Sequence, residues 1–142
     1  MPVSFMRTKR NIPVGFEPGE KYLAKIIYGK TVSLEKLSEY VAEASAMTEG
    51  DIYNVLVQSQ NVMIRLLTDG VPVDMGRFGR FYPKFKAQAM PNYDDVTSDT
   101  ISKFSVRFLP SVYFRNKLKD TKFEFREVQP KSYAPKPTPP TP

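Results

Sequence analysis

The sequence predicts an α+β fold, and three features of its 142 residues carry that prediction. Two segments place apolar residues at helical spacing behind a Ser or Thr that can cap a helix, and two later segments alternate apolar with basic residues as strands do. A last short helical pattern begins at Ser111. We therefore expect two N-terminal helices, an antiparallel β-sheet with an arm, a short C-terminal helix and extra terminal strands.

The composition limits the class of protein. A chain of 142 residues with 41% hydrophobic residues suits one compact domain with tails. Its longest apolar runs, such as residues 26–28 and 62–64, are far shorter than the roughly 20 residues that cross a bilayer. Near the N-terminus, Arg7, Lys9 and Arg10 are followed by no apolar run of the kind that a secretion signal needs. We expect a cytoplasmic protein without a membrane partner.

The absence of cysteine and histidine argues against an enzyme. The chain has no thiolate for metal or nucleophilic chemistry and no imidazole to shuttle protons near neutral pH. Neither a glycine-rich phosphate loop nor a nucleophile elbow occurs. Asp94, Asp95 and Asp99 could hold a hard cation, but such a site needs more converging oxygens, so a solvated acidic turn is favoured. We expect no catalytic residue, cofactor, bound metal or small-molecule substrate.

The charges are sorted along the chain, whose net charge is +6. Between residues 33 and 70, six acidic residues stand against two basic ones, a net of −4. Between residues 77 and 119, nine basic residues stand against three acidic ones, a net of +6. A basic strand half joined to an acidic helical half suits a protein that presents one face to phosphates; ordinary surface solvation is the alternative explanation.

Caps and apolar spacing predict both helices. Ser33 can cap the first, whose single buried stripe consists of Leu34, Leu37, Val41 and Ala44. The second begins at Thr48, whose hydroxyl can accept the amide of Asp51 while the Asp51 carboxylate reaches back to the cap. Gly70 is placed to end it.

The apolar stripe of the second helix is wide enough to pack on more than one neighbour. It comprises Ile52, Val55, Leu56, Met63, Leu66 and Leu67. A monomer core could account for this stripe. We expect a dimer instead, because two helices and a short sheet enclose little apolar volume alone.

The basic half reads as a strand, an arm and a returning strand. After a short edge strand around Pro72 and a turn at Met75-Gly76, the aromatic residues Phe78, Phe81 and Phe85 alternate with Arg77, Arg80, Lys84 and Lys86. Pro83 predicts a bulge or an edge position. Residues 88–102 read as a loop or mobile arm, and residues 101–109 resume alternation. The final helix is expected to turn Val112, Phe114 and Leu118 inward.

The two ends extend this arrangement. Residues 3–9 and 21–28 read as strands joined by a loop over 11–21, and residues 122–128 as another strand. From Pro130 onward the proline density predicts an extended tail. We expect an N-terminal strand extension over 1–30, a domain over 31–120, a C-terminal strand over 121–129 and a proline-rich tail over 130–142.

Residues 31–120 resemble the bacterial histone-like HU/IHF family of DNA-binding proteins. The resemblance lies in the order of five pieces: residues 34–37 in the first helix, the Thr48 to Asp51 start of the second, residues 66–74 at its end, Gly76-Arg77-Phe78-Gly79-Arg80-Phe81 in the hairpin, and residues 106–110 leading to 117–120. The added terminal strands resemble a longer branch of the family, found as HU-like domains with extended ends.

The resemblance implies an intertwined homodimer of the nucleoid, whose sheet forms a saddle on double-stranded DNA while two arms follow the minor groove, each with a proline wedged between base pairs. On this chain the saddle bases would be Arg77, Arg80, Lys84, Lys86, Lys103 and Arg107, and the wedge would be Pro91. The arm departs from the family pattern. Pro91 precedes Asn92 instead of following an Arg-Asn pair, and three aspartates lie close behind it.

Two functions follow as expectations. The first is architectural binding of duplex DNA, mainly through phosphate contacts and with little sequence specificity. The second is an HU-like fold that serves as a protein-interaction or structural dimer with weak or no DNA binding, which the acidic arm and the proline tail would suit.

Overall fold

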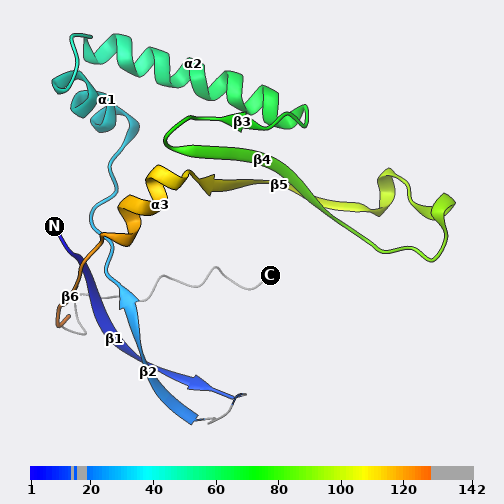
Figure 1. Cartoon of the computed structure of the whole chain (residues 1–142), viewed down its shortest axis with the longest axis horizontal. Helices are drawn as coiled ribbons and strands as arrows, with labels where there is room; N and C mark the ends of the chain where they lie inside the picture. The colour runs from blue at the N-terminus through cyan, green and yellow to red at the C-terminus, as the bar shows by residue number, and fades with distance from the viewer. Residues whose placement is uncertain (14, 16–18, 129–142) are drawn as a thin grey trace, which may run out of the picture. The chain divides into compact units, whose positions relative to one another are not determined.

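The computed structural model describes residues 1–13, 15 and 19–128, and has the mixed α+β architecture that the sequence predicts (Figure 1). The chain divides into two compact units, Thr31–Lys119 and a second made of Met1–Lys30 with Asp120–Pro142. No helix in the described part is long and apolar enough to span a membrane. The predicted proline-rich tail lies outside the described residues.

The two predicted N-terminal helices are confirmed. Helix α1 spans Leu34–Glu43 and helix α2 spans Glu49–Thr68. The amide of Lys36 donates to the Ser33 hydroxyl at 3.2 Å, which caps α1 as expected.

The cap of α2 forms as predicted, with both of its side chains engaged. The amide of Asp51 donates to the Thr48 hydroxyl at 3.3 Å, as predicted. The Asp51 carboxylate reaches back to the cap and accepts from that same hydroxyl at 2.6 Å. Aspartate is one methylene shorter than the glutamate of a capping box, so its carboxylate meets the side chain first.

Gly70 ends α2 as predicted. Its φ of +82° lies in the left-handed region that favours glycine. The Gly70 amide donates to the Leu67 carbonyl at 3.1 Å, and the Val71 amide donates to the Leu66 carbonyl at 2.9 Å. This pair of bonds is a Schellman motif, which satisfies the last carbonyls of α2 and turns the chain back toward the sheet.

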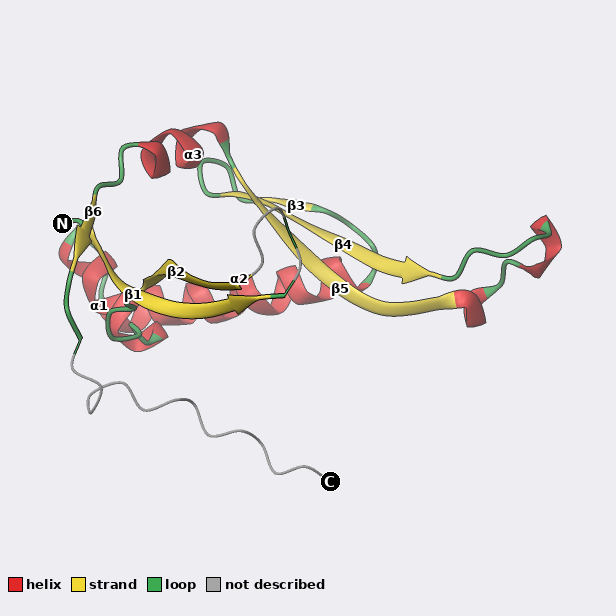
Figure 2. Ribbon diagram, turned by 90° about the horizontal axis from the view of Figure 1, so that it is seen from below, coloured by secondary structure: helices red, strands yellow, loops and turns green. Residues whose placement is uncertain are grey.

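The sheet of this unit has the strand order β3-β4-β5, with antiparallel pairs. Strand β3 spans Val73–Asp74, β4 spans Gly79–Ala87 and β5 spans Ile101–Pro110. Between β4 and β5 the chain forms the arm, which contains two short 3-10 turns, η1 at Tyr93–Asp95 and η2 at Ser98–Thr100 (Figure 2).

A bulge interrupts the β4–β5 pair. Lys84 lies opposite Ser105 and Lys86 opposite Ser102, so Phe85 faces two residues of β5. One of these is Lys103, whose φ is +49°. Pro83 itself stays in register, opposite Val106. The expectation of an edge at Pro83 is right, because β3 pairs with β4 only up to Phe81, but the bulge lies on the neighbouring strand.

Helix α3 spans Val112–Lys119, and the Ser111 hydroxyl accepts the Phe114 amide at 3.1 Å as its cap. The same hydroxyl donates to the Arg77 carbonyl, which ties the helix start to the turn before β4. The prediction that Val112 and Leu118 point inward is wrong within one chain, since they are 65% and 52% exposed. Of the three side chains, Phe114 packs against another aromatic ring, that of Phe78.

A cluster of aromatic rings links the sheet to α3. Its four rings are those of Phe78, Phe81, Phe108 and Phe114. The Phe78 and Phe108 centroids lie 4.8 Å apart, those of Phe81 and Phe108 4.9 Å, and those of Phe78 and Phe114 5.6 Å. These separations are those of favourable aromatic pairs.

Little else is fully buried within one chain. Among the described residues, Ile52 and Leu67 of α2 are the buried apolar side chains, and Ser38 of α1 is also buried. The predicted buried stripe of α1 is therefore wrong for the single chain, in which Leu37 and Val41 are 44% and 40% exposed. Ser38 can take the inner position because its hydroxyl donates to the Leu34 carbonyl at 2.8 Å.

The second unit contains a sheet of order β2-β1-β6. Strand β1 spans Val3–Ile12, β2 spans Gly19–Ile26 and β6 spans Phe123–Phe125. The strand pairs continue to Ile12 and Gly19, so the predicted loop over 11–21 is too long. The predicted strand over 122–128 shortens to three residues, the length over which β6 pairs in parallel with β1.

Gly79 supplies a stability test, because a Cβ atom there would lie 2.3 Å from the Leu109 carbonyl oxygen at a φ of +143°. We expect Gly79→Ala to lower the free energy of unfolding by about 2 kcal/mol or more. A Cβ at Gly50, in the first turn of α2, would meet nothing within 4 Å, so Gly50→Ala should leave stability unchanged or raise it by up to about 1 kcal/mol. Urea denaturation of both variants measures this, and equal stabilities would contradict the close approach of β4 and β5.

Candidate nucleic-acid interface

The strand register sorts the side chains of β4 and β5 onto two faces. Residues directly opposite each other in an antiparallel pair share a face, and alternate residues of one strand do too. One face, here called the basic face, therefore carries Arg80, Tyr82, Lys84 and Lys86 from β4 together with Leu109, Arg107, Ser105 and Ser102 from β5. Four of the predicted DNA-binding residues, Arg80, Lys84, Lys86 and Arg107, lie on it.

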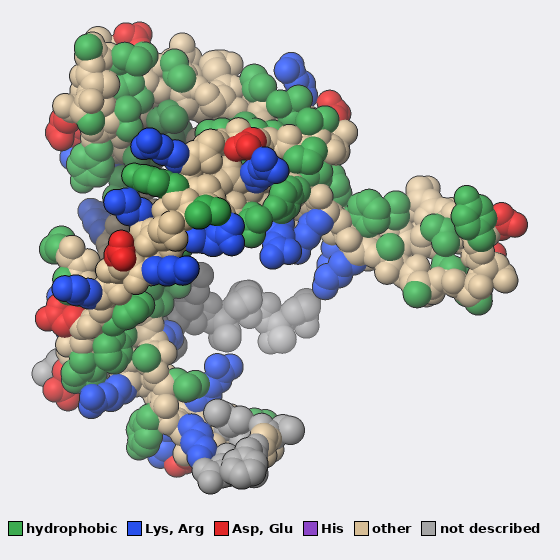
Figure 3. Space-filling view, in the orientation of Figure 1, with side chains coloured by type: hydrophobic (Ala, Val, Ile, Leu, Met, Phe, Trp, Pro, Cys, Tyr) green, Lys and Arg blue, Asp and Glu red, His purple; other side chains and the backbone are tan. Residues whose placement is uncertain are grey.

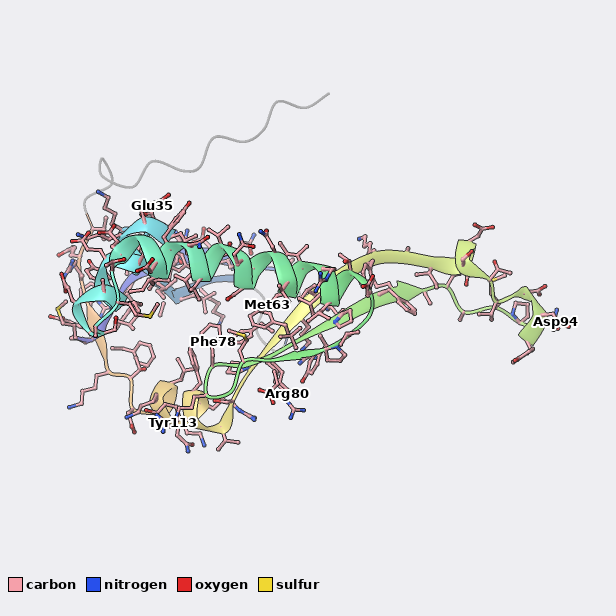
Figure 4. The ribbon with its side chains drawn as sticks, turned by 90° about the horizontal axis from the view of Figure 1, so that it is seen from above. Glu35, Met63, Phe78, Arg80, Asp94 and Tyr113 are labelled. Carbon is pink, nitrogen blue, oxygen red and sulfur yellow. The ribbon has the colours of Figure 1, made fainter. Side chains whose placement is uncertain are left out.

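The opposite face is apolar. It carries Phe81 and Phe108, which lie directly opposite each other, followed by the pair of Pro83 and Val106. In Figure 4, Met63 and Phe78 lie on the side of the sheet toward α2, and Arg80 lies on the other side. The predicted division of aromatic and basic side chains along β4 is thus what the register produces.

Arg80 has an acidic neighbour on the basic face. Its Nε lies 3.2 Å from Oδ2 of Asp74, which is its partner across the β3–β4 pair. Both side chains are more than half exposed, so this ion pair stabilises the fold little. It holds the Arg80 guanidinium at the surface, where a stronger anion can replace the carboxylate.

Arg77 lies apart from the basic face. It precedes β4, and its guanidinium carbon lies 4.8 Å from the ring centre of Tyr113 on α3. The Lys117 ammonium lies 5.6 Å from the same ring. Tyr113 thus gathers two cations at the start of α3.

Lys103 and Pro91 are also separate. Lys103 lies at the bulge of β5, off the regular alternation, so the register does not assign it to the basic face. Pro91 lies in the arm, two residues before η1, whose Asp94 and Asp95 give the tip its negative charge. Figure 3 shows acidic side chains at the end of the arm and basic ones along the sheet near α3.

Sequence reasoning missed a hollow beside Arg80. It has a volume of about 370 Å³ and brings Arg115 of α3 together with Arg80 and Tyr82 of β4, with Gly76, Gly79 and Ser111 among its other lining residues. Arg115 is far from Arg80 in sequence, and no local pattern pairs them. The one available signal was the run of basic residues along α3.

The described residues hold no group of three acidic, histidine or cysteine side chains that could bind a metal ion. A hydrogen bond from the Lys36 ammonium to the Glu39 carboxylate on the same exposed turn raises the pKa of Lys36. Glu35 and Lys36 belong to α1, away from the basic face (Figure 4). What the described surface offers is a row of cations along one face of the β4–β5 pair.

Comparison with solved structures finds a similar fold in a proposed bacterial DNA-binding protein from Bacteroides vulgatus. The two share 14% sequence identity with a TM-score of 0.61, and the match covers 92% of this chain. The chain spans about half of that protein, 51% of its length. No curated protein matches the sequence.

The family comparison covers nearly the whole described chain. Residues 1–125 match the model of the HU-HIG family, described as an HU domain fused to a winged helix-turn-helix, Ig or glycine-rich motif. That match includes strands β1 and β2, helices α1 and α2, the sheet β3-β4-β5 and helix α3. The chain therefore belongs to the HU-HIG family of HU-like domains.

Proposed function

We propose that this protein is a non-enzymatic, HU-like architectural DNA-binding protein of the nucleoid, which holds duplex DNA mainly through phosphate contacts and with little sequence specificity. The observation that carries the proposal is the basic face, where Arg80, Lys84, Lys86 and Arg107 share one side of a two-strand surface. Membership of the HU-HIG family and the DNA-binding description of the Bacteroides vulgatus neighbour support it.

The chemistry of the basic face favours phosphates over bases. Arginine, lysine, tyrosine and serine all donate hydrogen bonds to phosphate oxygens, and contacts of this kind position a protein without reading sequence. The face carries no Asn or Gln among its register positions, the side chains that recognise adenine in the major groove. Low specificity follows from that composition.

The arm is the weaker part of the interface. Pro91 is its candidate wedge between base pairs, but Asp94 and Asp95 follow within four residues and Asp99 lies in the second turn. Carboxylates close to a phosphate backbone oppose binding, so we assign the main contact to the basic face. Arg77 and Lys103 lie off the basic face and would add contacts only beside it.

A homodimer accounts for the exposed apolar surface of the helices. Val55 and Val62 lie one heptad apart on α2 and are 52% and 44% exposed, and Ile64 is 61% exposed. Leu37 and Val41 of α1 are 44% and 40% exposed as well, whereas the described residues bury only two large apolar side chains, Ile52 and Leu67. A second copy of the same helices would cover this exposed surface.

The acidic arm favours a second candidate function, an HU-like dimer that binds proteins. Tyr93 is 94% exposed and Val96 61% exposed, on either side of Asp94 and Asp95. An aromatic and aliphatic tip with two carboxylates suits a basic protein surface. This candidate predicts little binding of duplex DNA at physiological salt.

The first test replaces Arg80 and Arg107 together with alanine. Because each neutralised phosphate contributes about 0.9 to the slope of log affinity against log salt, the double variant should flatten that slope by about 1.8 and weaken binding to all sequences alike. Fluorescence anisotropy of labelled random duplexes over a salt series measures both. Lys36→Ala with Arg65→Ala is the control, since it removes the same charge from the helical half.

Two outcomes would count against the proposal. Wild-type protein that binds no duplex even at low salt would favour the protein-interaction function. A folded Arg80/Arg107 variant with the wild-type slope would remove these side chains from the contact surface.

The second test addresses the dimer through Val62→Asp. The side chain is 44% exposed in the single chain, so a carboxylate there costs a monomer little, but buried in a dimer it would be expensive. We expect the variant to lose dimer on sedimentation analysis or to unfold at lower denaturant. Asn61→Asp adds the same charge on the polar side of α2 and should change neither; a Val62→Asp dimer of wild-type stability would contradict the interface.

A further inference from the structure

Beside helix α3 lies a second hollow, which shares no lining residue with the one beside Arg80. It has a volume of about 410 Å³, within the range of roughly 300–1,000 Å³ that is typical of pockets for small ligands. Three of its apolar side chains are about half exposed, namely Phe78 at 47%, Tyr113 at 49% and Leu118 at 52%. The remaining lining residues are Arg77, Phe114 and Lys117. We call this pocket the aromatic hollow.

The aromatic hollow carries two positive charges. The Arg77 guanidinium and the Lys117 ammonium both lie over the ring of Tyr113, at 4.8 and 5.6 Å from its centre. Within the described residues, neither cation forms an ion pair with a carboxylate. An apolar hollow with two such cations suits an occupant that combines an aromatic group with negative charge.

The tip of the arm has that combination. Tyr93 is 94% exposed, and Asp94 and Asp95 follow it in the turn η1. Val96 beyond them is 61% exposed, and its amide donates to the Tyr93 carbonyl at 3.3 Å. The Asn92 side chain donates to the Asp95 carboxylate at 3.1 Å, but no described cation pairs with either aspartate. The tip thus presents an aromatic ring beside two negative charges.

The tip cannot reach the hollow of its own chain. Both belong to the unit Thr31–Lys119, in which the ten residues of β5 run from the arm toward α3. Ten residues of strand span about 33 Å. Figure 4 shows Asp94 and Tyr113 beyond opposite ends of the β4–β5 pair. An occupant with the chemistry of the tip would therefore come from another copy.

We propose that the aromatic hollow receives the arm tip of a second copy of this chain. The ring of Tyr93 enters between the apolar walls, and Asp94 and Asp95 face the two cations. Because the tip and the hollow are different surfaces, the contact is heterologous, and it joins copies into rings or open chains. The inference goes beyond DNA binding and does not depend on it.

Two charge reversals test the pairing. Asp94→Lys gives the tip a charge like that of the hollow, and Lys117→Glu gives the hollow a charge like that of the tip. Both side chains are exposed, so neither change should disturb folding. Each variant alone should associate at least about tenfold more weakly than the wild type, because an attraction becomes a repulsion. An equal mixture should regain wild-type association, since each variant supplies the partner that the other lacks. Sedimentation velocity over a concentration series at about 50 mM salt measures this.

A tryptophan reporter follows the contact itself. The chain has no tryptophan, so Tyr93→Trp places a single one at the tip. Its emission should shift to shorter wavelength as the protein concentration rises, and adding Lys117→Glu should abolish that shift. Lys119→Glu is the matched control, because it makes the same charge change on α3 outside the hollow and should leave the shift intact.

Three results would overturn the contact. The first is a mixture of Asp94→Lys and Lys117→Glu that associates no better than either variant alone. The second is an emission that does not shift with concentration in the wild-type hollow. The third is a loss of the shift with Lys119→Glu equal to that with Lys117→Glu, which would reduce the effect to the net charge of α3. None of these samples contains DNA, so each result leaves the proposed function standing.

Discussion

The close approach of β4 and β5 at Gly79 is the constraint on which the basic face depends. The Leu109 carbonyl and the Phe108 ring occupy the space of a side chain there. This contact sets the register in which Phe81 meets Phe108 and Tyr82 meets Arg107. Because side chains alternate along a strand, burying the aromatic residues on one face turns the basic ones outward on the other. The packing of the aromatic side chains therefore determines on which face of the sheet the arginine and lysine side chains lie.

Much of this arrangement could be predicted because its causes are local. Ser33, Thr48 and Gly70 act within three or four residues of themselves, through bonds that depend on residue type and spacing. The alternation in β4 likewise needs no distant partner to be recognised. Both helices and four residues of the basic face follow from these short-range rules.

The parts that could not be predicted depend on distant partners. The parallel pairing of β6 with β1 joins residues more than a hundred positions apart, and Arg115 meets Arg80 only through the fold. The bulge places Lys103 at a positive φ. A glycine or asparagine at that position would have indicated this backbone conformation from the sequence, but a lysine does not. The apolar stripe of α1 predicts that Leu37 and Val41 are buried. Such a stripe indicates which face of a helix is apolar, but it does not indicate what covers that face.

On the proposed dimer, dimerisation and DNA binding are linked. Because the described residues bury so few large apolar side chains, a second copy would add much of the apolar burial, and folding would depend on protein concentration. Each dimer would carry two basic faces, and linked contacts bind with a higher effective concentration than separate ones. DNA that bridges both copies would stabilise the folded state, since a ligand that binds only the folded form shifts unfolding in its favour. Modest phosphate contacts on each chain are then sufficient for firm binding without sequence recognition.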